Sequence, residues 1–328
     1  MKQILSYLLD YKTLSREEAK TALLRIAKGE VNASQIATFM SIYMMRSIAV
    51  QELEGFRDSM LELCLPMDMS EFDPIDLCGT GGDGKDTFNI STCSSFVVAG
   101  AGVKVAKHGN YGVSSLVGSS TVMEHFGYKF TNDKDILKKQ MEDCGICFMH
   151  APLFHPAMKH VAPIRKEMGL KTFFNMLGPM INPAFPKKQM VGVFSLELAR
   201  LYGYLYQLTD KNFMIVHSLD GYDEISLTGS FKMISNKKDQ VLEPENIGFK
   251  RYKQEELFGG ATLADSAKIF TNVLENKGTE PQKQVVLANA GMGIWCAKPH
   301  LKVEEAIAEA TESMESGKAL KVFKKLIA

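Results

Sequence analysis

The sequence lacks an excess of charge of either sign and has no long hydrophobic run. Its 328 residues carry 38 Lys and Arg against 38 Asp and Glu, so the formal net charge is zero. Without a long basic run, the chain is a poor candidate for bulk binding of nucleic acid. No apolar stretch is long enough to cross a membrane, and that of the N-terminal string MKQILSYLLDYK is too short for a signal peptide. We therefore expect a cytoplasmic protein.

Cysteine is scarce as well. Of the six cysteines, only Cys144 and Cys147, in the string CGIC, have the spacing of a motif. No second pair is present to complete a zinc site of the common type. A redox pair is one interpretation, but the string GICFMH has the pattern of a buried strand. Structural thiols are therefore the favoured interpretation.

The N-terminal part of the chain has the pattern of short amphipathic helices. Ser15 and Glu18 form a capping box ahead of one helix, Gly29 ends it, and Asn32 caps the next. Apolar residues recur at intervals of three and four, so each helix buries one face. Three methionines widen the apolar stripe of the helix after Asn32: Met40, Met44 and Met45. A stripe of that width favours a subunit interface, with burial in the core as the alternative.

From residue 75 onward, short apolar strands alternate with helices. The strand-like strings are PIDLC, VKVAKH, GICFMH, KQMVGVF and NFMIVHS. Such alternation predicts an α/β fold with a central, mainly parallel sheet flanked by helices. We therefore expect a small all-helical domain over residues 1–66 and a large α/β domain over residues 73–328. Ligands of such sheets bind where strands end and helices begin.

The first such junction is the string GTGGDGKDTFNIST, residues 79–92. It matches neither the Walker pattern nor GxGxxG. Its glycines permit close approach of backbone N–H groups to an anion, and Ser91 or Thr92 is placed to cap the following helix. Asp83 would repel a phosphate unless a magnesium ion accompanies it. Alternatively, Asp83 binds ribose hydroxyls, or the string is a tight turn with an Asx bond.

A second junction is the string AKHGNYGVSSLVGSST, residues 106–121. Lys107 offers a point charge for phosphate, and serine hydroxyls follow it. These serines are Ser114, Ser115 and Ser119. His108 and Asn110 favour a polar ligand beside the phosphates. Thr121 and Glu124 have the spacing of a capping box, which would place Ser119 just before a helix.

A third junction, DGYDEIS, follows the strand-like string NFMIVHS. Asp223 and Glu224 are adjacent carboxylates in a glycine-containing turn. Hard cations bind such pairs, and Mg²⁺ usually bridges to substrate phosphates. A solvated acidic turn is the alternative. Beside two loops of phosphate-binding type, the pair is interpreted as the protein anchor of the metal.

Together, the strings GTGGDG, TFNIST, KHGN, FNMLGPMINP and DGYDEIS occur in an order that resembles the anthranilate phosphoribosyltransferase family of tryptophan biosynthesis. The resemblance covers essentially the whole chain. It implies a helical domain that includes a returning segment near residues 170–190, and a homodimer formed through that domain. It also implies a Mg²⁺-dependent transfer of phosphoribose from phosphoribosyl pyrophosphate to the amino group of anthranilate, releasing pyrophosphate.

The resemblance also implies site residues. Those for phosphoribosyl pyrophosphate are Gly79, Gly82, Asp83, Thr87, Asn89, Ile90, Ser91, Thr92, Lys107, Ser115 and Ser119. Those for anthranilate are Gly79, Asn110, His155 and Arg165, and those for two Mg²⁺ ions are Ser91, Asp223 and Glu224. A guanidinium is a good partner for the anthranilate carboxylate, although Arg165 alone would also fit a surface salt bridge. His155 alone would fit a polar residue at the start of a helix.

The chemistry makes little demand on acid–base catalysis, because the amine of anthranilate is already neutral at pH 7. Its proton leaves through water or through His108, which is the one candidate catalytic residue. Two positions depart from the usual family pattern. Tyr111 stands where an Arg usually follows KHGN, and Thr121 stands where GSAD usually ends. These changes affect the contacts of the loop that covers the phosphates.

Three other functions remain open. A pyrimidine nucleoside phosphorylase shares the fold and the glycine-rich loop, but KHGN and DGYDEIS argue against it. A non-enzymatic relative that binds nucleic acid should have lost Asn110, His155 and Arg165 and gained basic patches, which this sequence has not. A transferase for a different aromatic amine fits the same motifs.

Overall fold

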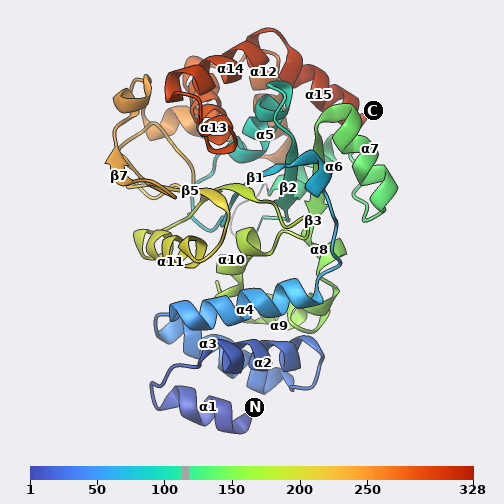
Figure 1. Cartoon of the computed structure of the whole chain (residues 1–328), viewed down its shortest axis with the longest axis vertical. Helices are drawn as coiled ribbons and strands as arrows, with labels where there is room; N and C mark the ends of the chain where they lie inside the picture. Colours follow the sequence, from blue (N-terminus) through green and yellow to red (C-terminus); the bar gives the residue numbers. More distant parts are fainter. Residues whose placement is uncertain (113–117) are drawn as a thin grey trace. The chain divides into compact units, whose positions relative to one another are not determined.

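The computed structural model describes residues 1–112 and 118–328, and the chain divides into two compact units (Figure 1). Unit 1 comprises Met1–Pro66 and Ala151–Pro183, and unit 2 comprises Met67–His150 and Ala184–Ala328. The segment that returns to the helical unit thus runs over residues 151–183, whereas the resemblance implied one near 170–190. In the part of the chain that is described, every helix is too short or too polar to span a bilayer.

Unit 1 is all-helical. Its helices are α1 (Lys2–Leu9), α2 (Arg16–Ala27), α3 (Ala33–Met45), α4 (Val50–Leu63), α8 (Ala151–Phe154), η2 (Pro156–His160), α9 (Ala162–Met168), α10 (Phe174–Leu177) and η3 (Gly178–Ile181). The predicted capping box of Ser15 and Glu18 is confirmed, and Asn32 accepts from the N–H of Gln35 over 3.0 Å. The string PAMKHVAPIRKEMG, which forms η2 and α9, lies after residue 75 and would by its position belong to the α/β alternation. In the structure α9 packs on α3 instead.

The core of unit 1 is aromatic and contains one buried carboxylate. The rings of Phe39, Tyr43, Phe56 and Phe173 pack against one another, with centroids 4.6–5.9 Å apart. Glu52, which is fully buried, joins the helices to the loops between them, since it accepts from four groups. These are the N–H groups of Leu14 and Ala49, the hydroxyl of Tyr43 and the guanidinium of Arg46.

The methionine stripe of α3 divides between core and surface. Met40 is fully buried in unit 1, while Met44 is 39% and Met45 87% exposed. Only the latter two are therefore available to an interface.

Unit 2 is built on a seven-stranded sheet in the order β3-β2-β1-β4-β5-β6-β7. The strands are β1 (Ile75–Gly79), β2 (Val105–Gly109), β3 (Ile146–His150), β4 (Lys188–Gly192), β5 (Asn212–Ser218), β6 (Phe231–Ser235) and β7 (Asp239–Leu242). The first five run parallel, and β6 and β7 are antiparallel. Every strand-like string of the sequence forms a strand, and the predicted fold class is confirmed. The carboxyl ends of β1, β2, β3 and β4 meet at one edge of the sheet, where Gly79 pairs with Gly192 and Gly109 with His150.

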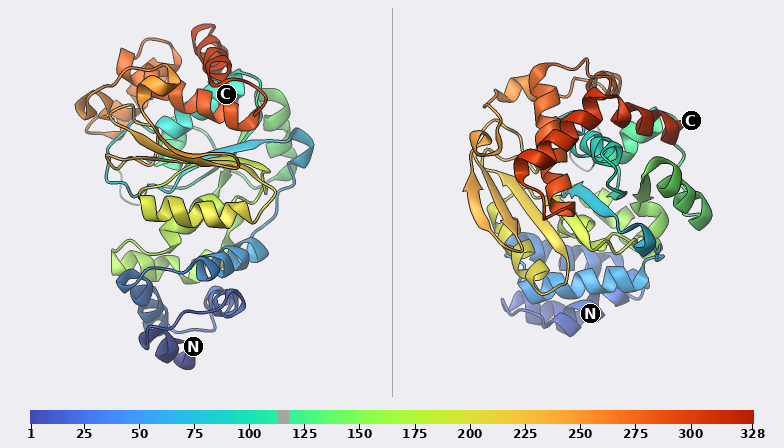
Figure 2. Two further views of the ribbon diagram at one scale, coloured as in Figure 1. Left: turned by 60° about the vertical axis from the view of Figure 1, so that its left-hand side comes forward. Right: turned by 45° about the horizontal axis from the view of Figure 1, so that its top comes forward.

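Helices cover both faces of this sheet (Figure 2). On one face, α5 (Ile90–Gly100) packs on β1 and α13 (Glu280–Ala297) packs on β4, and on the other α11 (Leu196–Gln207) packs on β5 (Figure 1). The remaining helices of the unit are α6 (Ser119–His125), α7 (Lys134–Cys144), α12 (Leu263–Leu274), α14 (Val303–Glu315) and α15 (Lys318–Ile327), with the short turns η1 (Ser70–Phe72), η4 (Pro244–Ile247) and η5 (Gln254–Leu257). The entirely buried Phe96 and Phe270 mark the core beneath α5 and α12.

All six cysteines are buried and free. Cys147 lies within β3, where burial raises the pKa of its thiol well above the usual range. A thiolate is the reactive form of cysteine, so this environment opposes redox chemistry. The structural interpretation of the CGIC string is the one that this geometry favours.

Candidate active site

The glycine-rich segment turns sharply at the end of β1. Gly81, Gly82 and Gly84 have φ angles of 63°, 79° and 72°, which side chains rarely tolerate. At Gly79 the backbone conformation is ordinary, and space is what requires glycine. A Cβ built there would lie 2.3 Å from Oδ2 of Asp223. The absence of a side chain at Gly79 is thus what allows the carboxylate to approach β1.

Three carboxylates from two distant parts of the chain, Asp83 and the adjacent pair Asp223 and Glu224, meet beside this turn. Oδ2 of Asp223 accepts from the N–H of Gly81 over 2.7 Å, and Oε1 of Glu224 accepts from the N–H of Ser91 over 2.9 Å. Burial, followed by the charge of Asp83, raises the pKa of Asp223 to about 7. Burial and the charge of Asp223 raise the pKa of Glu224 well above its usual value. The pKa of Asp83 is raised by burial too.

This cluster fits a divalent cation. Buried carboxylates that raise one another's pKa are stabilised in their charged form by a nearby positive ion. Among the described residues, no group of three or more His, Cys, Asp or Glu is placed to hold a metal ion, so at most two of these carboxylates would be ligands. Mg²⁺ normally takes only one or two carboxylates and completes its shell with water and substrate oxygens, so an incomplete protein ligand set suits it.

Lys107 lies beneath the turn rather than in solvent. Its side chain is only 1% exposed, and its Nζ donates to the carbonyl of Leu77 over 2.6 Å. Burial lowers the pKa of Lys107, while the negative charges of nearby groups, Asp76 first among the carboxylates, oppose that shift. The lysine predicted to supply a point charge is therefore held within the sheet, where burial disfavours its charged form.

The start of α5 differs from the prediction. Ser91 and Thr92 were expected to cap this helix, but both lie inside its first turn, and the cap position is Asn89, with a φ of 67°. The hydroxyl of Thr92 donates to Oδ1 of Asn89 over 2.5 Å. The N–H of Ser91 is instead satisfied by Glu224 from the loop after β5. Local capping rules fail here because a side chain from a remote segment takes the place of the cap.

The remaining predicted residues of this segment line the same turn. Ile90 is fully buried under the helix start, while Thr87 and Asn89 are half-buried. The backbone of Thr87 is in close contact with Gly259, where a Cβ would lie 2.4 Å from the carbonyl carbon of Thr87.

The second junction, at the end of β2, brings its polar residues together. His108 is buried, and its backbone N–H donates to Oδ1 of Asp76 over 3.1 Å. Asn110 is exposed, and its backbone carbonyl accepts from the hydroxyl of Ser119 over 3.2 Å. Ser114 and Ser115 lie outside the described residues.

The predicted capping box of Thr121 and Glu124 is wrong. Helix α6 begins at Ser119 with Gly118 as the cap position. Glu124 does not reach back to the helix start, because it accepts from the hydroxyl of Tyr111 over 2.7 Å.

The two predicted residues downstream of β3, His155 and Arg165, belong to unit 1. His155 is 3% exposed, and burial lowers its pKa to about 4, so the ring is neutral at pH 7. Burial also lowers the pKa of Arg165, whose guanidinium donates to Oδ1 of Asn175 over 3.2 Å and lies 5.3 Å from the ring centroid of Phe174. Within the described part of the chain Arg165 takes part in no ion pair, and its Nε has no hydrogen-bond partner. The alternative of a surface salt bridge is therefore wrong.

Asn175 is a residue beside Arg165, within unit 1, that sequence reasoning missed. Its Oδ1 accepts from the guanidinium of Arg165 and from the N–H of Thr172, and the residue is buried. The signal was present in the string FNMLGPMINP, which starts at Phe174. A single Asn in an apolar string gives no indication of which distant side chain it orients.

Both units match models of one protein family. Residues 71–320 match the α/β domain of a glycosyl transferase family, and residues 2–64 match the helical bundle domain of the same family. A curated anthranilate phosphoribosyltransferase of Cytophaga hutchinsonii is 61% identical over 327 residues, which cover 100% of both chains. The chain belongs to the anthranilate phosphoribosyltransferase family.

Solved structures of this family have the same fold. The anthranilate phosphoribosyltransferase of Thermus thermophilus superposes with a TM-score of 0.91 at 32% identity, covering 98% of both chains. That of Saccharomyces cerevisiae, in complex with phosphoribosyl pyrophosphate and Mg, gives 0.90 at 28% identity and covers 98% of this chain and 95% of its own. A second structure of the yeast protein, in complex with 4-fluoroanthranilate, gives 0.87 at 27% identity with the same coverage.

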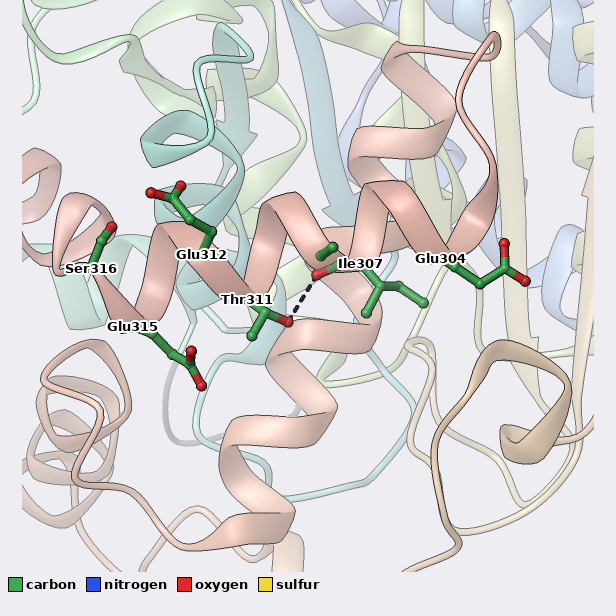
Figure 3. A pocket seen from close by; sticks show the side chains of 7 residues that line it. Glu304, Ile307, Thr311, Glu312, Glu315 and Ser316 are labelled. Atoms are coloured by element: carbon green, nitrogen blue, oxygen red, sulfur yellow. Dashed lines mark hydrogen bonds between the residues drawn. The ribbon is translucent and has the colours of Figure 1, made fainter.

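A surface pocket elsewhere on unit 2 does not fit the substrates of this family. It has a volume of about 510 Å³ and lies along α14 (Figure 3). Its lining residues are Glu304, Ile307, Ala308, Thr311, Glu312, Glu315 and Ser316. Three carboxylates without a Lys or Arg among these residues would repel a diphosphate, and none of the predicted site residues contributes to the pocket.

Proposed function

We propose that this protein transfers phosphoribose from phosphoribosyl pyrophosphate to the amino group of anthranilate, in a Mg²⁺-dependent reaction that releases pyrophosphate. The observation that carries this proposal is the meeting of Asp83, Asp223 and Glu224 with the glycine-rich turn and the start of α5. Acids beside anion-binding N–H groups suit a donor that arrives with a divalent cation. The yeast complex with phosphoribosyl pyrophosphate and Mg supports this donor.

The donor contacts are proposed from the family motifs and their place at the sheet edge. They are Gly79, Gly82, Asp83, Thr87, Asn89, Ile90, Ser91, Thr92, Lys107 and Ser119, together with Ser115, which lies outside the described residues. Mg²⁺ would be held by Ser91, Asp223 and Glu224. Because Asp223 bonds to the glycine-rich turn and Glu224 to α5, the two carboxylates serve different segments. The proposed number of two ions rests on the resemblance to the family alone.

The residues of the chain stabilise the leaving group and align the reactants. Bound Mg²⁺ supplies positive charge that stabilises the departing diphosphate. The N–H groups of the turn add preorganised dipoles, and Lys107 adds a charge behind them. The anthranilate amine is neutral at pH 7, so alignment contributes more than a strong base. His108, buried at the end of β2, is the candidate side chain for the amine proton, with water as the alternative.

Arg165 is the proposed partner of the anthranilate carboxylate. Its guanidinium is largely buried, has a free Nε among the described residues and forms no ion pair there, so it retains capacity for a carboxylate. The neutral ring of His155 and the exposed amide of Asn110 are the other proposed contacts, with Gly79. The yeast complex with 4-fluoroanthranilate supports an acceptor of this shape and charge.

Two wider predictions belong to this proposal. A homodimer through the helical unit is supported by its exposed apolar side chains, which include Tyr7, Leu9, Tyr11, Met44 and Met45. The cytoplasmic location expected from the sequence stays a prediction. The reaction is the second step from chorismate to tryptophan.

The test is to follow the fluorescence of anthranilate after phosphoribosyl pyrophosphate and Mg²⁺ are added, with each omitted in turn. We expect the fluorescence to fall only when both are present. Arg165→Lys should raise the KM for anthranilate more than it lowers kcat, because an ammonium cannot bind a carboxylate in bidentate geometry. Loss of fluorescence without the donor, or none with it, would contradict the proposal. Phosphorolysis of uridine or thymidine would favour the phosphorylase alternative instead.

A further inference from the structure

A compact group of side chains lies beside the proposed donor site without a role in the reaction as described. The hydroxyl of Tyr111 donates to Oε1 of Glu124 over 2.7 Å, and Oγ of Ser120 lies 2.8 Å from Nδ1 of His150. The ring of Tyr111 meets that of His150 edge-on, with centroids 5.1 Å apart, and the ring of Phe130 stacks on that of His150 with centroids 4.3 Å apart. We refer to these five residues as the Tyr111 cluster.

The Tyr111 cluster borders residues proposed to contact both substrates. His150 ends β3 and pairs in register with Gly109, the last residue of β2. The next residue, Asn110, accepts at its carbonyl from the hydroxyl of Ser119 over 3.2 Å and from the N–H of Ser120 over 3.1 Å. The backbone carbonyl of Asn110 thus joins two proposed substrate contacts: Asn110, proposed to contact anthranilate, and Ser119, proposed to contact phosphoribosyl pyrophosphate.

The segment that follows β2 and the start of α6 are packed closely against each other. A Cβ at Gly109 would lie 2.4 Å from Oγ of Ser119, and one at Gly118 would lie 2.0 Å from the backbone nitrogen of Gly112. Such packing fixes the position of Ser119 only if the segment after β2 and helix α6 are themselves held in place. On one side Tyr111 is tied to Glu124 of α6, and on the other Ser120 of α6 is tied to His150 of β3.

We propose that Tyr111 and His150 are positioning residues for phosphoribosyl pyrophosphate: through Glu124 and Ser120 they hold the first turn of α6, and with it Ser119, against the end of β2. The inference rests on the proposed function, because Ser119 is a donor contact only there. The bond between Ser120 and His150 is sealed from water, since the two side chains are 1% and 5% exposed. The bond of Tyr111 lies at the surface, where Tyr111 is 44% exposed.

The decisive variant is Tyr111→Phe, which keeps the ring against His150 and removes only the hydroxyl. We expect the KM for phosphoribosyl pyrophosphate to rise about five-fold, the effect of one ordinary hydrogen bond, with kcat within about two-fold of wild type. The melting temperature should not change, because the lost bond is exposed. Ser120→Ala should raise the same KM by breaking the bond to His150.

Two further variants separate positioning from general damage. Glu124→Gln keeps a carbonyl acceptor for Tyr111 and should leave the donor KM within about two-fold of wild type, whereas Glu124→Ala should reproduce Tyr111→Phe. Tyr128→Phe is the matched control. It removes a bond of 2.8 Å from the hydroxyl of Tyr128 to Oε1 of Gln140, and should leave the KM unchanged.

Calorimetric titration with phosphoribosyl pyrophosphate and Mg²⁺, without anthranilate, provides a readout that needs no turnover. Weaker donor binding in Tyr111→Phe, but not in Tyr128→Phe, would support the positioning role. Equal binding and equal KM in wild type and Tyr111→Phe would overturn it, and so would equal losses in Tyr111→Phe and Tyr128→Phe. A wild-type protein that consumes no anthranilate would refute the proposed function, a result distinct from either outcome of the Tyr111→Phe comparison.

Discussion

The N–H of Ser91 donates to Oε1 of Glu224 over 2.9 Å, although the two residues are 133 positions apart in the chain. The first turn of a helix carries partial positive charge, so a carboxylate there is stabilised as a bound anion would be. Asp223 holds the N–H of Gly81 in the same manner. The acidic pair therefore touches the same backbone groups that suit a phosphate. The proposed metal ligands and the proposed phosphate-binding turn thus share the N–H groups of Gly81 and Ser91.

Replacing Asp223 by Asn and Glu224 by Gln should remove most activity without harming the fold. We expect kcat/KM to fall at least about 100-fold, because amide oxygens bind Mg²⁺ more weakly than carboxylates do. The metal-free double variant should melt at a higher temperature than metal-free wild type, since the burial of charge and the repulsion that together raise the pKa of Asp223 and Glu224 are gone. Activity as a function of Mg²⁺ concentration, with thermal melts, measures both effects.

The control for that variant is Asp239→Asn, at an exposed ion pair with Lys232 on the sheet edge. It should change neither activity nor melting temperature by more than a small amount. Wild-type turnover by the double variant at saturating Mg²⁺ would refute the metal assignment.

Gly79→Ala tests whether the space beside β1 serves the metal site. The new Cβ would lie 2.3 Å from Oδ2 of Asp223 and would force the carboxylate away. We expect about a ten-fold loss of apparent Mg²⁺ affinity, similar to the loss of a supporting contact. Gly203→Ala is the matched control, because its nearest neighbour, Cγ2 of Ile234, is 3.5 Å away and alanine favours the helix. Equal Mg²⁺ dependence in both variants would contradict the prediction.

The sequence predicted what depends on local pattern. The five parallel strands follow from short apolar strings between turns, and the first helices follow from capping signals such as Ser15 with Glu18. The position of the acidic pair relative to the glycine-rich turn also follows, because parallel strands present their carboxyl ends at one edge. This is why Gly81 and Asp223, distant in the chain, belong to one predicted site.

The sequence pattern did not reveal which distant groups pair with each other. Thr121 and Glu124 have the spacing of a capping box, yet Glu124 binds Tyr111. Likewise, Ser91 has the chemistry of a helix cap, yet Glu224 satisfies its N–H. In each case a partner from outside the local segment offers a better bond than the local rule provides. Such competition is decided by tertiary packing, which periodicity does not contain.

Glu52 should be the most sensitive polar residue of the helical unit. It is fully buried and accepts from two backbone N–H groups, Tyr43 and Arg46. Glu52→Ala leaves these donors, including a largely buried guanidinium, without their acceptor, and we expect a loss of about 3–5 kcal/mol in the free energy of unfolding. Glu62→Ala, which removes an exposed pair with Lys20, should cost less than about 1 kcal/mol. Urea denaturation followed by circular dichroism distinguishes the two, and similar losses would contradict the prediction.

The burial of His155 predicts a specific pH dependence of stability. Its pKa is lowered to about 4 in the folded protein, whereas an exposed histidine titrates near about 6.5. Between these values the unfolded chain takes up a proton that the folded chain does not. The contribution of His155 to the free energy of unfolding is therefore complete above about pH 6.5 and falls as the pH is lowered towards 4, by about 3 kcal/mol in total.

His155→Gln removes this titration, so the stability of wild type should fall more steeply between pH 7.5 and pH 4.5 than that of the variant. His300→Gln, at an exposed position, is the control and should keep the wild-type slope. Urea titrations at several pH values give the free energy of unfolding for all three proteins. The sign of the difference between the pH slopes of wild type and His155→Gln matters as much as its size. If wild type lost less stability than His155→Gln on acidification, the folded state would favour the imidazolium form of His155. That result would replace the neutral ring proposed beside anthranilate with a cation, and the acceptor carboxylate would then have two positive partners instead of Arg165 alone.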